Sequence, residues 1–157
     1  MSERLPEDLL KKFVGTAIND VKTRIRTKKL VKFAKAIGAA EEKYIGDNAI
    51  QHPAYIGSII VKALFSLADA KVQNEKGEDV KLITNAGKVL HGGQGYKYYP
   101  DAPPLKDGEI IVTSGKLTNV YIKNGMLFLE AKMTTKNEAG EIVQDTFLSA
   151  IVRPGGF

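Results

Sequence analysis

The sequence predicts an α+β fold in which a curved antiparallel sheet wraps around one long buried helix. The first observation is the segment 53–71, PAYIGSIIVKALFSLADAK, whose polar residues Ser58, Lys62, Ser66 and Asp69 are four, four and three positions apart. As a helix, this segment has a narrow polar stripe and is apolar on nearly every other side. The second observation is that almost everything after it has the alternating pattern of strands. A helix of this kind must be covered, and one curled sheet can cover it.

A short helix and a strand are the first elements expected along the chain. Residues 6–13 predict a helix on the surface, with Pro6 in its first turn and Gly15 just beyond its end. In residues 21–27, VKTRIRT, the side chains alternate between apolar or threonine and cationic. This period of two is typical of a strand with one buried face.

A second helix is expected to begin at Thr27, as its cap, and to stop at Gly38, which can adopt a left-handed backbone conformation. Four strands follow the long helix, at residues 87–99, 109–123, 126–135 and 141–153. Asn124-Gly125 and the NEAG run at residues 137–140 predict hairpin turns between the last three. An open α+β sandwich fits the same pattern. The wrapped arrangement, known as the hotdog architecture, is our prediction.

Length and composition predict a single soluble domain spanning residues 1–157. Hydrophobic residues make up 43% of the chain and charged residues 26%, and a chain of this length buries roughly two-thirds of its unfolded surface. The absence of cysteine excludes disulfides, thiolate catalysis and zinc-thiolate sites. The N-terminus lacks the apolar core of a signal peptide, and no apolar stretch is long enough for a bilayer. We therefore expect a cytoplasmic protein without membrane contact.

An ordered set of short motifs resembles the MaoC-like acyl-CoA hydratases and dehydratases, and more closely the N-terminal halves of their two-domain members. The motifs are FVGT at residues 13–16, KFAKAIG at 32–38, HPAYIG at 52–57, KVLHGGQGYKYYP at 88–100 and LSAIVRPGGF at 148–157. Each is weak alone, but together they span nearly the whole chain in the family order. The resemblance implies a hotdog fold, an acyl-CoA thioester as substrate, (R)-specific hydration or dehydration, and work in pairs of hotdog domains.

Active members of this family have a G-D-x-N-P-x-H signature after the second helix, whose Asp and His are thought to activate one water. In the direct register this signature falls on Gly38 and AAEEKY, so that Ala39 replaces the Asp, Glu41 the Asn and Tyr44 the His. Alanine does not titrate, and tyrosine keeps its proton up to about pH 10. By this register the chain resembles the half without the catalytic pair.

A second register, eight residues later, restores the glycine, the aspartate and the histidine at Gly46, Asp47 and His52. A carboxylate and an imidazole on one water form a workable acid/base pair. In this register, however, the Asn and Pro of the signature become Ala49 and Ile50. The structural alternative is that Asp47 opens a turn and that His52 precedes the helix beginning at Pro53. Asp47 and His52 are therefore the fallback catalytic pair.

A substrate-binding role is expected for His91, Gly92 and Gly93, because glycines at the start of a strand let a ligand approach the backbone closely. The same glycines are equally consistent with a β-bulge. Two histidines without clustered carboxylates are poor evidence for a metal site, so none is expected. No cofactor is expected either, because the substrate itself carries coenzyme A.

The net charge of +5 is unevenly distributed. A basic segment, residues 22–35, contains seven cations and no acid: Lys22, Arg24, Arg26, Lys28, Lys29, Lys32 and Lys35. The simplest interpretation is a solvated face, and contact with the phosphates of coenzyme A is an alternative. Interleaved aromatics, RNP motifs and zinc-finger spacing are all missing from the sequence, so no nucleic-acid partner is expected.

Three functions remain open at this point. The first is an acyl-CoA-binding subunit that shapes the thioester site while a partner hotdog chain supplies the catalytic pair. The second is a self-sufficient homodimeric enoyl-CoA hydratase that uses Asp47 and His52. The third is a non-enzymatic homodimer that binds acyl-CoA or lipid. Acyl chain length, pathway and reaction direction do not follow from the sequence.

Overall fold

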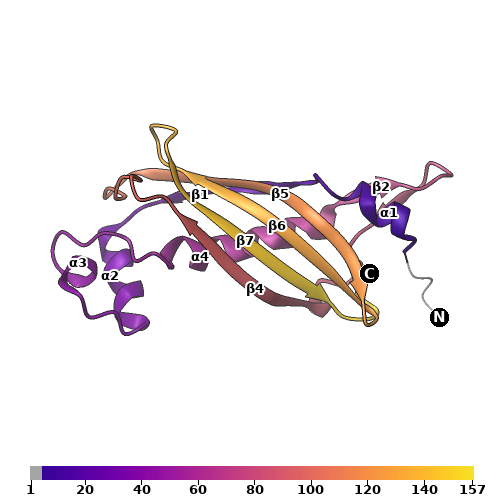
Figure 1. Ribbon diagram of the computed structural model, residues 1–157, viewed down its shortest axis with the longest axis horizontal. Coiled ribbons are helices and arrows are strands. Elements are labelled where there is room, and N and C mark those ends of the chain that lie inside the picture. The colour runs from indigo at the N-terminus through magenta and orange to yellow at the C-terminus, as the bar shows by residue number, and fades with distance from the viewer. Residues whose placement is uncertain (1–4) are drawn as a thin grey trace.

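One curved antiparallel sheet dominates the molecule. The structure is a computed structural model that describes residues 5–157, apart from the side chain of Lys62. The spatial order of the strands is β1 (Ala17–Arg24), β5 (Ile110–Lys123), β6 (Met126–Lys136), β7 (Ile142–Val152) and β4 (Val89–Tyr98). Figure 1 shows this sheet curving along a helical segment that crosses its concave face. The expected α+β hotdog class is confirmed.

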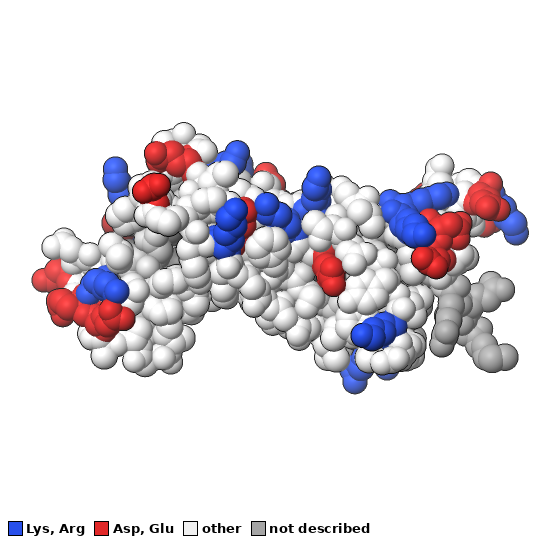
Figure 2. Space-filling view, in the orientation of Figure 1, with Lys and Arg blue, Asp and Glu red and all other residues white. Residues whose placement is uncertain are grey.

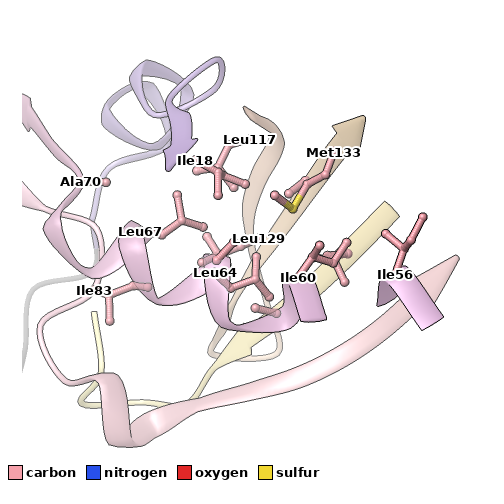
Figure 3. Packing of buried hydrophobic residues seen from close by; sticks show 14 of the residues in the cluster. Ile18, Ile56, Ile60, Leu64, Leu67, Ala70, Ile83, Leu117, Leu129 and Met133 are labelled. Atoms are coloured by element: carbon pink, nitrogen blue, oxygen red, sulfur yellow. The ribbon is translucent and has the colours of Figure 1, made fainter. Parts of the chain in front are cut away.

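The central helical segment has two parts. It begins as the α-helix α4 (Tyr55–Ile60) and continues as the 3-10 helix η1 (Val61–Asp69). Ile56, Ile60 and Leu67 on this segment are at most 1% exposed. In Figure 3 they point toward side chains from the strands, among them Leu117, Leu129 and Met133.

The central helix is buried against the sheet as expected, but it differs from the expected single α-helix in two details. The helix changes to 3-10 geometry after Ile60, and Phe65, an apolar residue, is 61% exposed on its outer side. A single sheet covers only one side of the helix, so the other side of η1 keeps an apolar surface uncovered.

The first helix, α1 (Glu7–Lys12), has one buried side. Leu9 and Leu10 are buried and Phe13, which follows the helix, is fully buried. The helix lies on the surface as expected, with its charged residues exposed, and its apolar side closes one end of the core. Gly15 has a φ of +90° and donates its N–H to the carbonyl of Leu117 at 2.8 Å.

Two helices, α2 (Thr27–Ala36) and α3 (Glu42–Ile45), lie beside the start of α4. Thr27 was expected to cap α2, but the helix begins at Thr27 and its N-cap is Arg26. The N–H of Thr27 donates to Oδ1 of Asp107 at 2.7 Å, so a carboxylate distant in sequence takes the place of the cap. Gly38 ends this region with the expected positive φ of +76°.

The turns follow the sequence signals closely. Asn124 and Gly125 both have positive φ, +52° and +74°, as a two-residue hairpin turn requires. Gly140, in the NEAG run, has a φ of +80°. The small hairpin of β2 (Lys71–Gln73) and β3 (Asp79–Lys81) and the short helix η2 (Ala86–Lys88) were not anticipated.

The C-terminal tail is fastened to the segment that leads into β4. The carbonyl of Gly156 accepts hydrogen bonds from the N–H groups of Thr84 and Asn85, at 2.8 and 3.3 Å. Gly156 is buried, and a Cβ there would lie 2.6 Å from side-chain atoms of Lys88 and Val152. Two of the sequence motifs, at residues 88–100 and 148–157, therefore meet in space.

Candidate functional site

His52 is held by its neighbours at the end of the loop before α4. Its Nδ1 accepts a hydrogen bond from the N–H of Ala54 at 3.2 Å. Its ring lies edge-on to Tyr44, with centroids 4.9 Å apart, and 6.1 Å from the ring of Phe33. The Nδ1 atom of His52 is thus engaged by the backbone of the turn that leads into α4. The half-buried ring serves as a packing and turn residue here.

Asp47 lies apart from this arrangement. Its side chain is exposed, and within residues 5–157 it forms neither a hydrogen bond nor an ion pair with His52. The two candidate catalytic residues are thus close in sequence without being joined as an acid/base pair. Such contacts often tighten only with a substrate bound, so their catalytic role stays a prediction.

The direct register of the family signature leads to residues that cannot activate water. Ala39 is partly buried and its N–H donates to the carbonyl of Ala34, at the close of α2. Tyr44 is 8% exposed, and Lys43 lies over its ring at 4.8 Å. Lys43 also pairs with Glu41 at 2.8 Å. This loop is therefore closed by packing and by a local ion pair.

Two polar side chains of β4 converge on the start of the central helix. A Cβ at Gly57 would lie 2.3 Å from the hydroxyl of Tyr96 and 2.4 Å from Nε2 of Gln94. A larger residue at this position would force both side chains to move. The Nε2 of Gln94 is buried and has no hydrogen-bond partner within the described part of the chain. Burial raises the pKa of Tyr96, so its hydroxyl stays protonated and can donate at neutral pH.

An apolar groove of about 70 Å³ runs between η1 and the beginning of β4. Its walls include Leu64 and Phe65 from η1 and Val89, Leu90 and His91 from β4. Leu90 is 43% exposed and His91 is exposed as well. Of the three expected substrate-binding residues, His91 thus lies at an open apolar surface rather than inside a closed pocket.

Gly92 and Gly93 form a β-bulge. The register between β4 and β7 shifts between His91 and Gly93, and a Cβ at Gly92 would come within 3.0 Å of Ser149 and Ile151 side-chain atoms. Of the two interpretations left open by the sequence, the bulge is therefore present. A binding role for the same glycines stays a prediction.

The strand β4 forms an open edge of the sheet. It pairs with β7 alone, so its other side offers unpaired N–H and C=O groups. The opposite edge strand, β1, carries Asp20, Lys22 and Arg24, charges that discourage pairing with another strand, whereas Lys97 is the only Lys, Arg, Asp or Glu in β4. In Figure 2 the surface over β4 is mostly free of charged side chains. The β4 edge therefore has the character of an interface.

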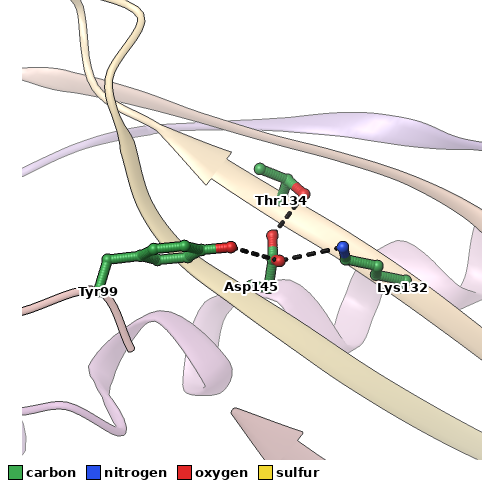
Figure 4. Close-up of polar contacts among 4 residues, drawn as sticks. All are labelled: Tyr99, Lys132, Thr134 and Asp145. Carbon is green, nitrogen blue, oxygen red and sulfur yellow. Dashed lines mark hydrogen bonds and ion pairs between the residues drawn. The ribbon is translucent and has the colours of Figure 1, made fainter. Parts of the chain in front are cut away.

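A second polar cluster, around Asp145, has a structural role. The carboxylate of Asp145, 2% exposed, accepts hydrogen bonds from the hydroxyls of Thr134 and Tyr99 at 2.6 and 2.8 Å and pairs with Lys132 at 3.1 Å. Figure 4 shows these three partners converging on it. Both carboxylate oxygens are engaged, so the cluster fixes the segment after β4.

Other kinds of site find little support in the described residues. In residues 5–157, no three His, Asp or Glu side chains gather closely enough to hold a metal ion. Over the same range, the helices are too short or too polar to cross a membrane.

The sequence contains a partial signal for the site formed by Gln94, Tyr96 and Gly57. Gln94 and Tyr96 alternate with Gly93 and Gly95, which is the period that sends them to one face of a strand. Gly57 interrupts an otherwise bulky apolar helix. That these three residues meet depends on how β4 crosses the helix, which the sequence does not specify.

Comparison with known proteins gives one family and a set of similar folds. The family model described as "FAS1-like, dehydratase domain region" matches residues 12–146. A search of curated proteins finds no significant match.

Three solved structures illustrate the similarity of fold. The R-hydratase PhaJ1 from Pseudomonas aeruginosa is 16% identical, with a TM-score of 0.64 over 92% of this chain and 84% of that one. The ChsH1-ChsH2 complex from Mycobacterium tuberculosis is 12% identical, with a TM-score of 0.62 over 89% and 98%. The HadBC (3R-hydroxyacyl-ACP dehydratase) complex from the same organism is 11% identical, with a TM-score of 0.65 over 88% and 96%.

Proposed function

The chain belongs to the FAS1-like dehydratase domain family, and from this premise we propose that it is a substrate-binding subunit of a hydratase or dehydratase. In this proposal it binds an acyl-CoA thioester and pairs with a second hotdog chain. The partner supplies the catalytic Asp and His, and the reaction is the (R)-specific hydration of a 2-enoyl-CoA or its reverse. No cofactor takes part.

One observation carries the proposal: neither register of the family signature forms an assembled acid/base pair within residues 5–157. In the direct register, Ala39 and Tyr44 occupy the two positions. In the later register, His52 is packed against Tyr44 and its Nδ1 is engaged by Ala54, while Asp47 faces solvent. Within residues 5–157, neither register therefore offers an assembled pair that could take a proton from water.

The surface features support pairing with another chain. The open β4 edge, the exposed Phe65 and the apolar groove beside them form one continuous uncovered region. Exposed apolar patches beside an unpaired strand are typical of interaction surfaces. Two of the similar structures, ChsH1-ChsH2 and HadBC, are themselves complexes.

Gln94 and Tyr96 are the residues we propose as polar contacts for the thioester. An unpaired buried amide donor costs about 1–3 kcal/mol, and Nε2 of Gln94 has no partner within residues 5–157. A carbonyl oxygen of the bound acyl group can accept its hydrogen bond. The apolar wall beside His91 would then receive part of the acyl chain.

The purified chain alone tests this proposal with crotonyl-CoA, by following the loss of the enoyl thioester. We expect hydration near background, because general acid/base help is typically worth about 100-fold to 10,000-fold and no such group is assembled here. Asp47→Asn and His52→Ala should leave this low rate unchanged. Turnover by the chain alone that either substitution abolishes, with the fold intact by circular dichroism, would establish the self-sufficient hydratase instead.

A further inference from the structure

The basic segment has a consistent geometry in the folded chain. In α2, Lys28, Lys32 and Lys35 follow one another at spacings of four and three, so they share one face of the helix. That face is turned away from Leu30 and Ala34, which are buried. All three lysines are exposed. They form a single cationic stripe, called here the α2 stripe.

The strand before α2 extends the positive surface. Lys22 and Arg24 in β1 are exposed and alternate with the half-buried Val21 and Thr23. Only two residues separate the end of β1 from the start of α2. The cations of β1 and those of α2 are therefore neighbours along the chain, and both sets are exposed to solvent.

These cations have no acidic partner in the part of the chain that the structure describes. Within residues 5–157, none of the seven cations of the basic segment forms an ion pair, and the only side-chain hydrogen bond is from Nη1 of Arg24 to the carbonyl of Gly108. The acid at the start of α2, Asp107, is occupied by the N–H of Thr27. Farther along, Glu41 pairs with Lys43.

An unpaired stripe of this kind is unfavourable for the helix itself. Like charges three and four positions apart destabilise a helix, and an ordinary solvated face mixes charges of both signs. The α2 stripe therefore fits a face that meets a multiply charged anion.

The packing of α2 places the stripe near the start of the central helix. Phe33 of α2 lies edge-on to Tyr55, with ring centroids 5.6 Å apart, and 6.1 Å from the ring of His52. Figure 1 shows α2 beside the beginning of α4. Helix α2 therefore packs beside the end of the central helix that contains Gly57, where Gln94 and Tyr96 converge. The stripe lies on the outer side of α2.

We propose that the α2 stripe binds the phosphate groups of coenzyme A while the thioester reaches the concave side of the sheet. This inference rests on the proposed function. Coenzyme A carries a diphosphate and a 3′-phosphate at one end and the thioester at the other, separated by the pantetheine arm. One end of the ligand is thereby matched by cations and the other by neutral donors and an apolar wall.

Calorimetric titration of the purified full chain with crotonyl-CoA and with crotonyl-pantetheine, which lacks the nucleotide phosphates, tests the proposal. The test variant is Lys28→Gln/Lys32→Gln/Lys35→Gln, since glutamine retains good helix propensity. The matched control is Lys76→Gln/Lys81→Gln/Lys123→Gln, three exposed lysines without ion pairs among the described residues. Both variants lower the net charge by the same amount.

We expect the test variant to bind crotonyl-CoA about tenfold or more weakly and with less dependence on salt, because screened charge contacts are lost. Its affinity for crotonyl-pantetheine and the affinities of the control should be unchanged. If the test and control variants bind crotonyl-CoA with equal affinity while crotonyl-pantetheine still binds, the α2 stripe does not hold the phosphates. The proposed function would then be unaffected. If neither ligand binds the wild-type chain, the proposed function fails as well.

Discussion

His52 illustrates how little a spacing says about chemistry at the level of single residues. The interval between Asp47 and His52 matches a water-activating signature, yet the ring of His52 packs against Tyr44 and its Nδ1 is engaged by Ala54. The spacing was visible in the sequence. Which way the two side chains turn depends on contacts with Phe33 and Tyr44, which come from other elements and were not predictable.

Asp145 is the residue whose charge most affects stability in this account. Burial raises its pKa, but hydrogen bonds from Thr134 and Tyr99 together with Lys132 outweigh this and hold the pKa below its ordinary value. The ionised form is therefore favoured in the folded chain. Its contribution to the free energy of unfolding is complete above the unfolded pKa of about 3.9 and is lost as the pH falls through the lower folded pKa.

We predict that Asp145→Ala lowers the free energy of unfolding by about 1.5–3 kcal/mol at pH 7, since hydrogen bonds to a buried charged group are lost. The difference from wild type should shrink as the pH falls from 5 toward 2. Urea denaturation at several pH values measures it, with the exposed Asp101→Ala as control. A difference that stays constant down to pH 2 would show that the Asp145 charge contributes nothing.

The strands and turns were predictable at the level of elements, and the central helix only in part. Alternation of apolar and polar residues located β4 to β7 within one or two residues of their ends, and Asn124-Gly125 predicted the hairpin that both positive φ angles confirm. The cap of α2 was not predictable, because Asp107 is 80 positions from Thr27. The open side of η1 was missed because composition does not say how far around a helix one sheet extends.

The central helix gives a sharp test of the packing. Ile60 is fully buried against the sheet, whereas Phe65 on the same segment is 61% exposed. Ile60→Asp should unfold the protein, because a buried charge without a partner costs on the order of 3–5 kcal/mol out of a total stability of about 5–15 kcal/mol. Phe65→Asp should still unfold cooperatively on heating. A soluble and cooperatively folded Ile60→Asp variant would refute the buried packing of α4.

Self-association follows from the uncovered region at the level of the whole molecule. Without a partner, the β4 edge and the exposed Phe65 should contact another copy of the chain. Such contact would give the unpaired strand groups hydrogen-bond partners and would bury the apolar surface. Sedimentation at micromolar concentration should therefore show a species larger than the monomer. Phe65→Asp should shift it toward the monomer, while Val14→Asp, which changes a residue exposed elsewhere, should not.

A clean monomer of the wild-type chain at that concentration would contradict this prediction. The two edges of the sheet also differ in charge: charged side chains on β1 discourage pairing with another strand, whereas β4 lacks this protection. The asymmetry was visible in the sequence only after the order of the strands was known.

Crotonyl-CoA hydration by this chain mixed with a second hotdog chain that has an intact G-D-x-N-P-x-H signature tests most directly which chain supplies the catalytic pair. The mixture should turn over substrate while each chain alone does not. Asp47→Asn and His52→Ala in this chain should change the rate by less than about tenfold, a loss of at most about 1.4 kcal/mol of transition-state stabilisation. Substitution of the signature Asp in the second chain should abolish the reaction. If His52→Ala abolishes turnover instead, with the complex still assembled, the catalytic pair is on this chain and the account is wrong.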